Sequence, residues 1–325
     1  MFEPAQAFLR DVQTRPGSPE AGVAHRAYGV TQWFTGNFVE ARTHLEHAAA
    51  IFDPERDRDL AFRFGQDVGV SAMVYLAIVL WPLGEVDRAR EIADATAARI
   101  ANLNHLATST YGLMHCAMFE IIARNAGRAG PLAKALSSVA HEHRIALWIG
   151  FGAFLEAWVE LESAPASVAL LSMRRAAALL DADGVGAFKP LVKVSLAEAR
   201  NGEPKAALAT LEEALDGFDR TGQRWFNAEI HRMRSEILLE LNPADPALAV
   251  DALLTAIGVA QAQKTRSFEL RAALALARLY RSTGRHADAQ AAIGPALEGF
   301  APTPELPEIA AALAFVGDIE AGAQL

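Results

Sequence analysis

Two histidines spaced for one helix face are the residues of this chain that most resemble metal ligands. His44 and His47 lie three positions apart, and Glu40 lies four positions before His44. Side chains three and four positions apart share one side of a helix. A zinc site needs a third and usually a fourth ligand, whereas carboxylates are common on any solvated helix face. We therefore predict a solvated face here, with no bound metal ion and no other cofactor.

The sequence also lacks the residue pairs of a nucleophilic centre. His115 and Cys116 are adjacent, so on a helix their side chains point about 100° apart and do not form a nucleophile–base pair. Leucine, methionine and alanine flank Cys116, which predicts a buried thiol. Neither a GxSxG nucleophile motif nor a GxxxxGK[ST] phosphate loop occurs. We expect no catalytic residues and no enzymatic activity.

Composition limits the classes of partner. The 325 residues carry a formal net charge of −9, which argues against a general nucleic-acid or anionic-membrane binder. One cysteine excludes an internal disulfide and fits a reducing compartment. Residues 1–10 lack the basic start and apolar run of a signal peptide, and residues 68–83 are too short to span a membrane. We expect a cytoplasmic protein.

A repeated pattern of small residues around turn glycines, called the ladder below, predicts the helices that carry the side chains discussed above. Four glycines share it, each with a small residue seven positions before and an alanine five positions after: Gly36, Gly84, Gly202 and Gly284. Successive glycines are 48, 118 and 82 residues apart, which correspond to one, three and two steps of roughly 40 residues. Such self-similarity is typical of stacked helical repeats. No run alternates with period two, so we predict an all-α fold.

The ladder and the turn signals predict the organisation of the chain. A helix over residues 4–14 and a linker occupy residues 1–20. Four hairpins follow over 21–181, with an unusually long loop at 53–67, and three more over 187–299 after a break at DADGVG. A capping helix is predicted within 303–325. We expect the turn of the third hairpin near 126–131.

These positions resemble the tetratricopeptide repeat. The small residue, turn glycine and alanine are in register with that motif, and Phe38 and Tyr280 occupy its aromatic places. Pro204, His286 and Glu198 depart from it. The resemblance covers most of the chain and implies a right-handed superhelix, or solenoid, of about seven hairpins. A fold of this kind offers a surface to partners rather than a catalytic pocket.

A narrower resemblance concerns residues 29–84 and 267–290. Both stretches are similar to the C-terminal repeat region of large bacterial signalling proteins, in which a class III cyclase or a serine/threonine kinase is joined to an ATPase of the AAA/STAND type. No cyclase, kinase or ATPase motif occurs here. The resemblance implies a partner-sensing or scaffolding part, with an upstream cyclase or ATPase domain as one candidate partner.

The first helix of each hairpin is expected to line the inner face. Tryptophan and arginine recur there, and both are favoured at interface hot spots. The candidate partner-binding residues are Arg26, Trp33, Trp81, Lys189, Arg271, Arg278 and Arg281. We expect an aromatic N-terminal and a basic C-terminal half of this face, with Arg271, Arg278 and Arg281 meeting an acidic peptide or anionic ligand. Alternatively, the tryptophans are interhelical core.

The long loop contains a second set of candidates. DPERDRD at 53–59 mixes both signs of charge and lacks the spacing of a calcium loop. Phe62, Arg63 and Phe64 follow it and are predicted to fold the loop onto the stack or onto a partner. A plain solvated loop is the alternative.

Two functions remain open at this point. We favour a non-catalytic interaction or sensor scaffold of a bacterial regulatory system, which binds a protein or peptide on the inner face. The alternative is a small-ligand- or peptide-sensing regulator whose superhelix closes around its ligand. An open basic groove would favour the first, and an apolar inner face with one deep pocket the second.

The helix predicted at 4–14 lies where the second helix of a preceding hairpin would lie. Its apolar residues Phe8, Leu9 and Val12 would then have a single neighbour to cover them. Because an open solenoid end exposes core, we expect this end to be covered by an upstream domain, to self-associate or to fray. Slow hydrogen exchange there in a monomer would contradict this expectation.

Overall fold

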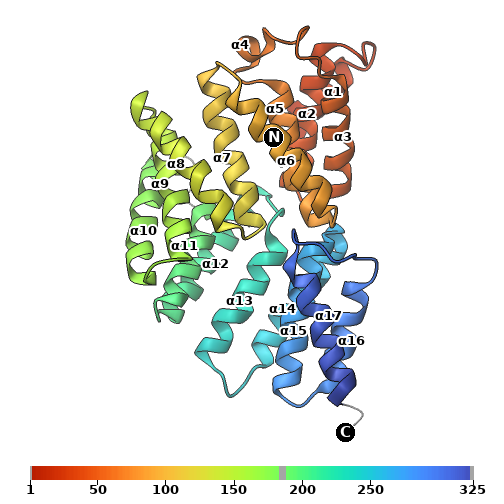
Figure 1. Cartoon of the computed structure of the whole chain (residues 1–325), viewed down its shortest axis with the longest axis vertical. Helices are drawn as coiled ribbons and strands as arrows, with labels where there is room; N and C mark the ends of the chain where they lie inside the picture. Colours follow the sequence, from red (N-terminus) through yellow and green to blue (C-terminus); the bar gives the residue numbers. More distant parts are fainter. Residues whose placement is uncertain (1, 183–187, 323–325) are drawn as a thin grey trace.

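Helices make up all the regular structure that a computed structural model gives for residues 2–182 and 188–322, the part of the chain described below (Figure 1). Within these ranges there are 17 helices and no strand. The predicted all-α solenoid is confirmed. None of the described helices is both long and apolar enough to cross a membrane.

Fourteen of the helices form seven antiparallel hairpins. Their bounds are α2 Pro19–Phe34 with α3 Phe38–Ile51, α5 Val68–Leu83 with α6 Val86–Ala101, α7 Leu106–Ile122 with α8 Ala126–Glu142, α9 Ala146–Leu161 with α10 Ala166–Ala182, α11 Phe188–Arg200 with α12 Pro204–Thr221, α13 Asn227–Leu241 with α14 Ala247–Gln263, and α15 Arg266–Ser282 with α16 His286–Leu297. The remaining helices are α1 Phe2–Asp11, α4 Leu60–Phe64 and α17 Pro307–Gly322.

Small residues allow the paired helices to approach. The alanines five positions after the turn glycines, Ala41, Ala89, Ala207 and Ala289, are all fully buried. A methyl group built on Gly29, seven positions before the first turn, would lie 2.9 Å from Leu45 Cγ. The ladder therefore marks the places where helices of a hairpin cross, because only small side chains fit there.

The third hairpin turns earlier than expected. Its turn lies at residues 123–125, and α8 already begins at Ala126 and contains Pro131. Arg124 takes the left-handed conformation (φ 60°) that glycine takes in other turns. The prediction of a turn near 126–131 was wrong because it relied on Gly127, Gly130 and Pro131 as breakers, whereas a non-glycine residue occupies the left-handed position.

The solenoid winds back onto itself, so that its last hairpins lie beneath the ends of its first ones (Figure 1). Three hydrogen bonds make this contact: Arg224 N donates to Phe34 O (2.7 Å), Ser267 Oγ to Trp81 O (2.7 Å) and Arg271 Nη1 to Ile122 O (2.9 Å). We call them the closure contacts. The acceptors are end carbonyls of α2, α5 and α7, groups that a helix cannot satisfy internally.

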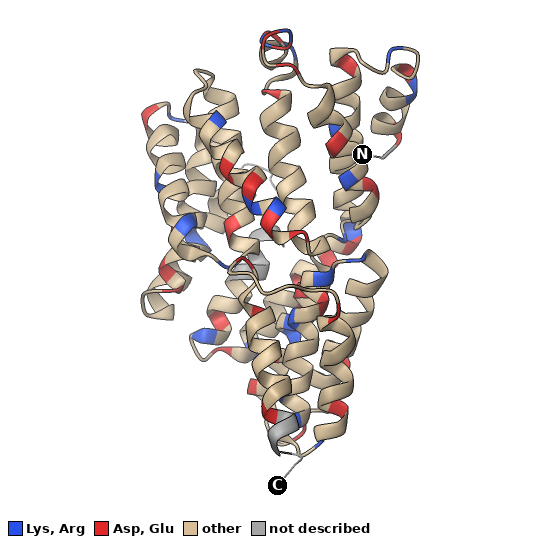
Figure 2. Cartoon of the chain, turned by 45° about the vertical axis from the view of Figure 1, so that its right-hand side comes forward, with Lys and Arg blue, Asp and Glu red and all other residues tan. Residues whose placement is uncertain are grey.

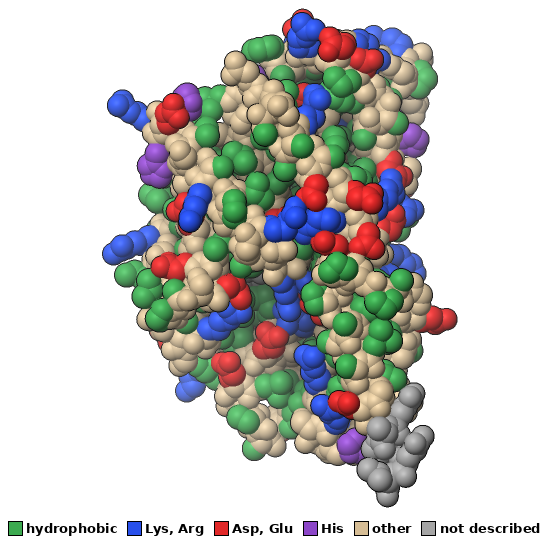
Figure 3. All heavy atoms as spheres, viewed as in Figure 1, with side chains coloured by type: hydrophobic (Ala, Val, Ile, Leu, Met, Phe, Trp, Pro, Cys, Tyr) green, Lys and Arg blue, Asp and Glu red, His purple; other side chains and the backbone are tan. Residues whose placement is uncertain are grey.

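Charged and aromatic groups reinforce the closure. Arg90 of α6 lies between Glu120 of α7 (2.5 Å) and Glu305, which precedes α17 (2.7 Å). Arg266 and Phe300, whose guanidinium and ring centre are 5.2 Å apart, both lie beside Gly84 at the end of α5. Elsewhere, acidic and basic side chains are interspersed along the helices and over the face seen in the space-filling view (Figures 2 and 3). The two ends of the chain are thus joined by specific pairs.

The N-terminal elements pack on the first hairpin. Val12 is buried with Ala21 and Ala24, and Phe8 and Leu9 pack partly against them. In the long loop, Leu60 is buried against Val23 and Val68. The first helix and the loop therefore extend the core rather than hang free.

Candidate functional site

An apolar pocket lies at the centre of the closed solenoid. Its volume is about 150 Å³. Residues of α2, α5, α7, α9 and α12 line it together with residues of the connection between α12 and α13: Trp33, Phe34, Tyr75, Met114, His115, Met118, Ile121, Ile122, Phe151, Phe154, Leu155, Phe218, Trp225 and Phe226. Helices of the first five hairpins thus meet at one concave, mostly apolar site, which is the usual character of small-molecule sites.

Two tryptophans far apart in the sequence, Trp33 and Trp225, meet in its wall. The ring centres of Trp33 and Trp225 are 4.6 Å apart, with the planes inclined at 35°. Only 1% of Trp33 and 7% of Trp225 is exposed. Neither indole Nε1–H has a hydrogen-bond acceptor among the described residues. Both nitrogen atoms are almost fully inaccessible, so the two indoles contribute packing surface to the wall.

A histidine and a tyrosine satisfy each other in the same wall. His115 Nδ1 lies 2.8 Å from the Tyr111 carbonyl oxygen, and His115 Nε2 lies 3.0 Å from Tyr75 Oη. A carbonyl only accepts, so in the neutral ring Nδ1 carries the proton and Nε2 accepts from the Tyr75 hydroxyl. Burial raises the pKa of Tyr75 well above its ordinary value. The Tyr75 hydroxyl therefore stays protonated.

Two predicted inner-face residues serve the closure instead. Trp81 is fully buried beneath Arg271, whose guanidinium lies 4.4 Å from the indole ring centre. The Arg271 side chain is 2% exposed and its Nε lies 2.7 Å from Glu308 of α17. The expected open, basic C-terminal face is therefore absent at Arg271, because the winding of the chain covers that side chain with the cap and with α7.

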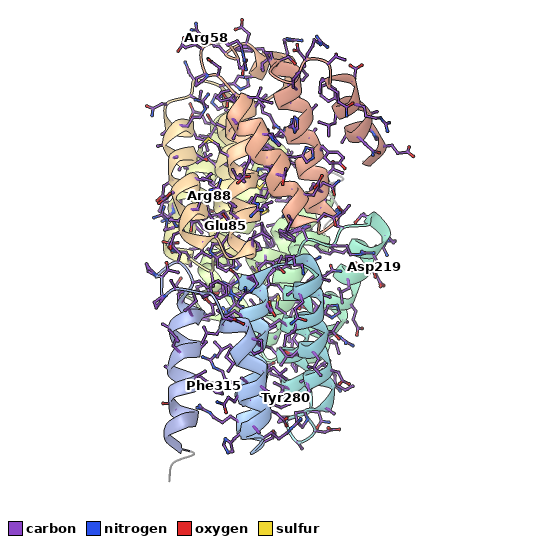
Figure 4. The ribbon with its side chains drawn as sticks, turned by 90° about the vertical axis from the view of Figure 1, so that its right-hand side faces the viewer. Arg58, Glu85, Arg88, Asp219, Tyr280 and Phe315 are labelled. Atoms are coloured by element: carbon purple, nitrogen blue, oxygen red, sulfur yellow. The ribbon has the colours of Figure 1, made fainter. Side chains whose placement is uncertain are left out.

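The other predicted inner-face residues are dispersed. Arg26 is half-buried, and its Nε has no acceptor among the described residues. Arg278 is exposed, and Arg281 lies 4.5 Å from the ring centre of Phe315. Phe315 is labelled on α17 in Figure 4. The side chain of Lys189 lies outside the described part of the chain. With Arg271 buried, the three C-terminal arginines do not form one accessible surface.

The loop candidates differ from one another in exposure. Phe64 packs against the buried cluster of Val23, Leu60 and Val68. Arg63 reaches Glu20 (3.4 Å). Phe62 is 76% exposed, with its ring edge-on to His105 at 5.1 Å. Phe64 thus belongs to the stack and Phe62 projects from it; partner binding by these residues stays a prediction.

A third histidine joins the pair identified from the sequence. His25 of α2 lies 3.0 Å from His44, between their Nδ1 atoms, and its ring centre is 5.1 Å from that of His47. Burial, followed by the charges of His44 and His47, lowers the pKa of His25 to about 4. Residues 2–182 and 188–322 contain no set of three or more His, Cys, Asp or Glu placed to hold a metal ion. His25 and His44 form a half-buried contact between α2 and α3, and His47 lies exposed at its edge.

Glu229 is a buried carboxylate that sequence reasoning did not single out. Arg232 lies 3.0 Å from it, Arg124 3.5 Å and Arg271 3.7 Å. Burial alone would raise its pKa, but the charges of the three arginines outweigh burial and lower the pKa to about 2. Trp225 was missed as well, because it lies in a connection where the ladder has no position. The only signal in the sequence was an aromatic pair, Trp225–Phe226, between two hairpins.

Comparison with known sequences bears out the repeat. The family model described as tetratricopeptide repeat matches residues 22–47, 70–95 and 270–295. The uncharacterized protein R02095 of Rhizobium meliloti (strain 1021) is 21% identical over 240 residues. That match covers 73% of this chain and 23% of the relative, so the chain spans less than a quarter of the relative's length.

Solved structures share the architecture at low identity. The apo form of RapI superposes with a TM-score of 0.52 at 10% identity, covering 91% of this chain and 99% of that one. Aspartyl phosphate phosphatase F from Bacillus subtilis gives 0.50 at 10% identity, covering 89% and 73%. Human IFIT1, as a dimer with m7Gppp-AAAA, gives 0.50 at 14% identity, covering 91% and 66%. The chain is thus an all-α solenoid, three segments of which match the tetratricopeptide-repeat model.

Proposed function

We propose that this chain is a ligand-sensing regulator whose superhelix closes around a small apolar ligand. The observation that carries the proposal is the central pocket of about 150 Å³, walled by aromatic and aliphatic side chains. The burial of Arg271 also speaks against an open basic groove. An apolar inner face with a deep pocket is what distinguishes a ligand sensor from a scaffold that lays a partner along its groove.

The pocket and the closure share neighbouring residues. Trp33 and Trp225 line the pocket, and the next residue after Trp33 and the one before Trp225 form a closure contact, Arg224 N to Phe34 O. A ligand that touches both tryptophans binds the closed form better than an opened one. A ligand shifts a conformational equilibrium toward the form that it binds more tightly. Binding in the pocket would therefore favour the closed form of the solenoid.

The test compares two variants that place the same large side chain at different positions. Met118→Trp fills the pocket, whereas Val168→Trp adds the same group to the exposed face of α10. Each protein is purified natively from its host lysate and denatured, and the released small molecules are identified by mass spectrometry. We expect a compound that accompanies the parent and Val168→Trp but not Met118→Trp. The same compounds from all three proteins, or none from any, would contradict the proposal.

A protein-interaction scaffold is the second candidate, and an exposed apolar stripe on α10 favours it. Val168, Leu171 and Leu179 lie on one face of this helix and are about half exposed. Exposed apolar patches are typical of protein contacts. Replacing all three with serine should abolish a partner's recovery in cross-linking from lysate, whereas Leu248→Ser on α14, a leucine that is even more exposed, should not. Equal recovery from both variants would remove this candidate.

The cellular setting belongs to the same proposal. We place the chain in the bacterial cytoplasm, as a part of a signalling system and without catalysis of its own. Its relative in Rhizobium meliloti is much longer, which supports a regulatory segment joined to other domains; an upstream cyclase or ATPase domain is one such partner. The net charge of −9 supports a partner other than nucleic acid, although a neighbour of the same fold, IFIT1, carries m7Gppp-AAAA.

A further inference from the structure

We infer that two copies of this chain pair through the face formed by α8, α9 and α10, called the α10 face below. In this dimer α10 of one copy lies antiparallel on α10 of the other, and Arg175 of each copy meets Glu156 and Glu160 of the other. Figure 1 shows these helices at the side of the molecule away from α16 and α17. Within the described part of the chain, the groove of this face shares no lining residue with the central pocket. The inference is therefore independent of the proposed ligand.

A groove with unpaired charges is the first observation. It runs between α8 and α10, over α9, and its volume is about 700 Å³. Four charged side chains line it: Lys134, Glu156, Glu160 and Arg175. None of the four forms an ion pair or a side-chain hydrogen bond within residues 2–182 and 188–322. The preceding residue of α10 is different, since Arg174 binds Glu198 (2.6 Å) and Glu203 (3.2 Å). The groove therefore offers charges that an approaching surface can pair.

The balance of these charges favours a second copy as that surface. Two of the four groove side chains are basic and two are acidic, so a uniformly basic or uniformly acidic partner would bring like charges together. A second copy of the same face carries both signs in equal number, and a two-fold dimer makes each contact twice. The net charge of −9 opposes self-association over the surface as a whole. A face without an excess of negative charge is where two copies can approach.

The apolar stripe of α10 lies on the rim of this groove. Val168, Leu171 and Leu179 are each about half exposed. Together with Arg175 they stand at offsets of 0, 3, 7 and 11 along the helix, so all four share one side of it. Leu179 and Arg175 also line the groove. Burial of the stripe supplies the driving force for association, and the charges beside it determine the orientation.

The stripe itself fixes the register of the two helices. Val168 and Leu179 lie at its two ends, 11 positions apart. A two-fold axis midway between them lays Val168 of each copy on Leu179 of the other. The same axis brings Arg175 of one copy level with Ser172 of the other, a small side chain that lines the groove. The long arginine side chain can thus extend past it into the groove of the other copy.

The acidic side chains lie at that level of the groove. A methyl group built on Gly150 of α9 would lie 3.7 Å from Leu179 Cβ of α10. Because the two helices are antiparallel, Glu156, which is six positions after Gly150, is nearly level with Ser172. Glu160 follows one turn later on the same side of α9. The two carboxylates therefore lie where the arginine of the other copy arrives.

A charge-exchange experiment with the full chain tests the pairing. One variant is Arg175→Glu, and the other combines Glu156→Lys with Glu160→Lys. Sedimentation equilibrium over a dilution series measures the dissociation constant of the dimer. We expect each variant alone to self-associate at least about 10-fold more weakly than the parent, because like charges then meet in both halves of the interface. An equimolar mixture of the two variants should associate nearly as tightly as the parent, because every introduced charge then meets its opposite.

Matched variants separate the α10 face from the rest of the surface. Arg278→Glu makes the same change at an exposed arginine of α15 and should leave the dimer as in the parent. Replacing Val168 and Leu179 with serine keeps every charge but should weaken the dimer, because less apolar surface is buried. Met118→Trp, which fills the pocket, should dimerise like the parent. Circular dichroism checks that each variant keeps its helices.

The outcomes that would overturn the inference are distinct. A parent that stays monomeric at every concentration would exclude the dimer. A dimer that tolerates both charge variants would lie on another face. A mixture that associates no more tightly than either variant alone would exclude the pairing of Arg175 with the two glutamates. A monomeric parent that cross-links to another protein only while the stripe is intact would assign the α10 face to that protein instead.

Discussion

At the residue scale, buried charge holds the distant parts of this solenoid together. Glu229 belongs to α13, yet the arginines around it come from α13, α15 and the turn after α7. A buried ion pair is not in itself strong evidence of net stabilisation, but removing one partner leaves the others as uncompensated charges. Glu229 is thus a position at which a small chemical change has a large effect.

Glu229→Gln keeps the shape of the side chain and removes its charge. We expect the free energy of unfolding to fall by about 3 kcal/mol, because Arg232 and Arg271 each lose the more deeply buried of their two carboxylate partners. Glu46→Gln breaks the exposed pair with Arg88 (2.7 Å) and should cost less than about 1 kcal/mol. Urea unfolding followed by circular dichroism measures both. Similar losses in the two variants would show that the Glu229 cluster contributes no more than a surface pair.

The histidine cluster predicts an acid-sensitive first hairpin. The pKa of His25 is lowered to about 4 in the folded chain, against about 6.5 when unfolded. Between these values the unfolded chain binds more protons, so stability rises with pH across this window and is lost as pH falls through it. Glu40, 3.2 Å from His44 Nε2, opposes the effect at His44 but does not touch His25.

Comparison of unfolding midpoints at pH 7 and pH 5 tests this expectation. His25→Gln should lessen the loss at pH 5 by about 1 kcal/mol, after allowance for the partial exposure of the ring. His286→Gln, at an exposed position at the start of α16, is the matched control and should leave the loss unchanged. A parent-like loss in both variants would mean that His25 does not contribute to the pH dependence.

At the scale of elements, each hairpin depends on the residues where its helices cross. Ala207 is fully buried between α11 and α12, whereas Ala209, two positions later, is exposed. Ridges of one helix fit the grooves of the other only if the side chain at the crossing is small. The spacing of alanines therefore fixes the hairpin geometry more strictly than the identity of the larger core residues.

Ala207→Leu should overpack the fifth hairpin and lower its stability by about 1–3 kcal/mol. Ala209→Leu adds the same atoms on the solvent side and should change stability by less than about 0.5 kcal/mol. Denaturant midpoints of the two variants give the comparison. An unchanged midpoint for Ala207→Leu would show that the helices separate without cost at this crossing.

At the scale of the whole molecule, the turn glycines Gly36 and Gly202 occupy the same repeat position in the sequence but have different structural roles. Gly36 (φ 84°) faces the closure, where a methyl group would collide with Gln263 Nε2 and lie 3.1 Å from Arg224 Cβ. Gly202 (φ 77°) has nothing within 4 Å of that position. The same left-handed turn is thus purely local in the fifth hairpin and part of the closure in the first.

Alanine at either glycine should cost about 1–2 kcal/mol through left-handed strain. Gly36→Ala should also loosen the closure, which hydrogen–deuterium exchange would detect as faster exchange over residues 224–230 and 263–271. In Gly202→Ala those segments should exchange as in the parent. If both variants left the closure equally protected, the contact around Gly36 would be dispensable.

The local pattern of the sequence determined the helices and hairpins of this chain. Helical periodicity and turn glycines act over a few residues, so the crossing at Ala41 and the turn at Gly36 could be placed without knowledge of the rest. Trp33 could also be assigned to the inner face, because its place follows from its distance to the turn. The turn of the third hairpin was predicted a few residues too late, because Arg124 occupies the left-handed conformation in which glycine is expected.

The closure, the pocket and the buried charges were decided only by the tertiary structure. They depend on the pitch of the superhelix, which sums a small rotation at every repeat and has no local signature. This sum brings Trp225 to Trp33, covers Arg271 with α17 and places Arg124 beside Glu229. The spacing of alanines determines how the two helices of one hairpin pack. The contact between Trp33 and Trp225, some 190 positions apart, depends on the geometry of all the repeats between them.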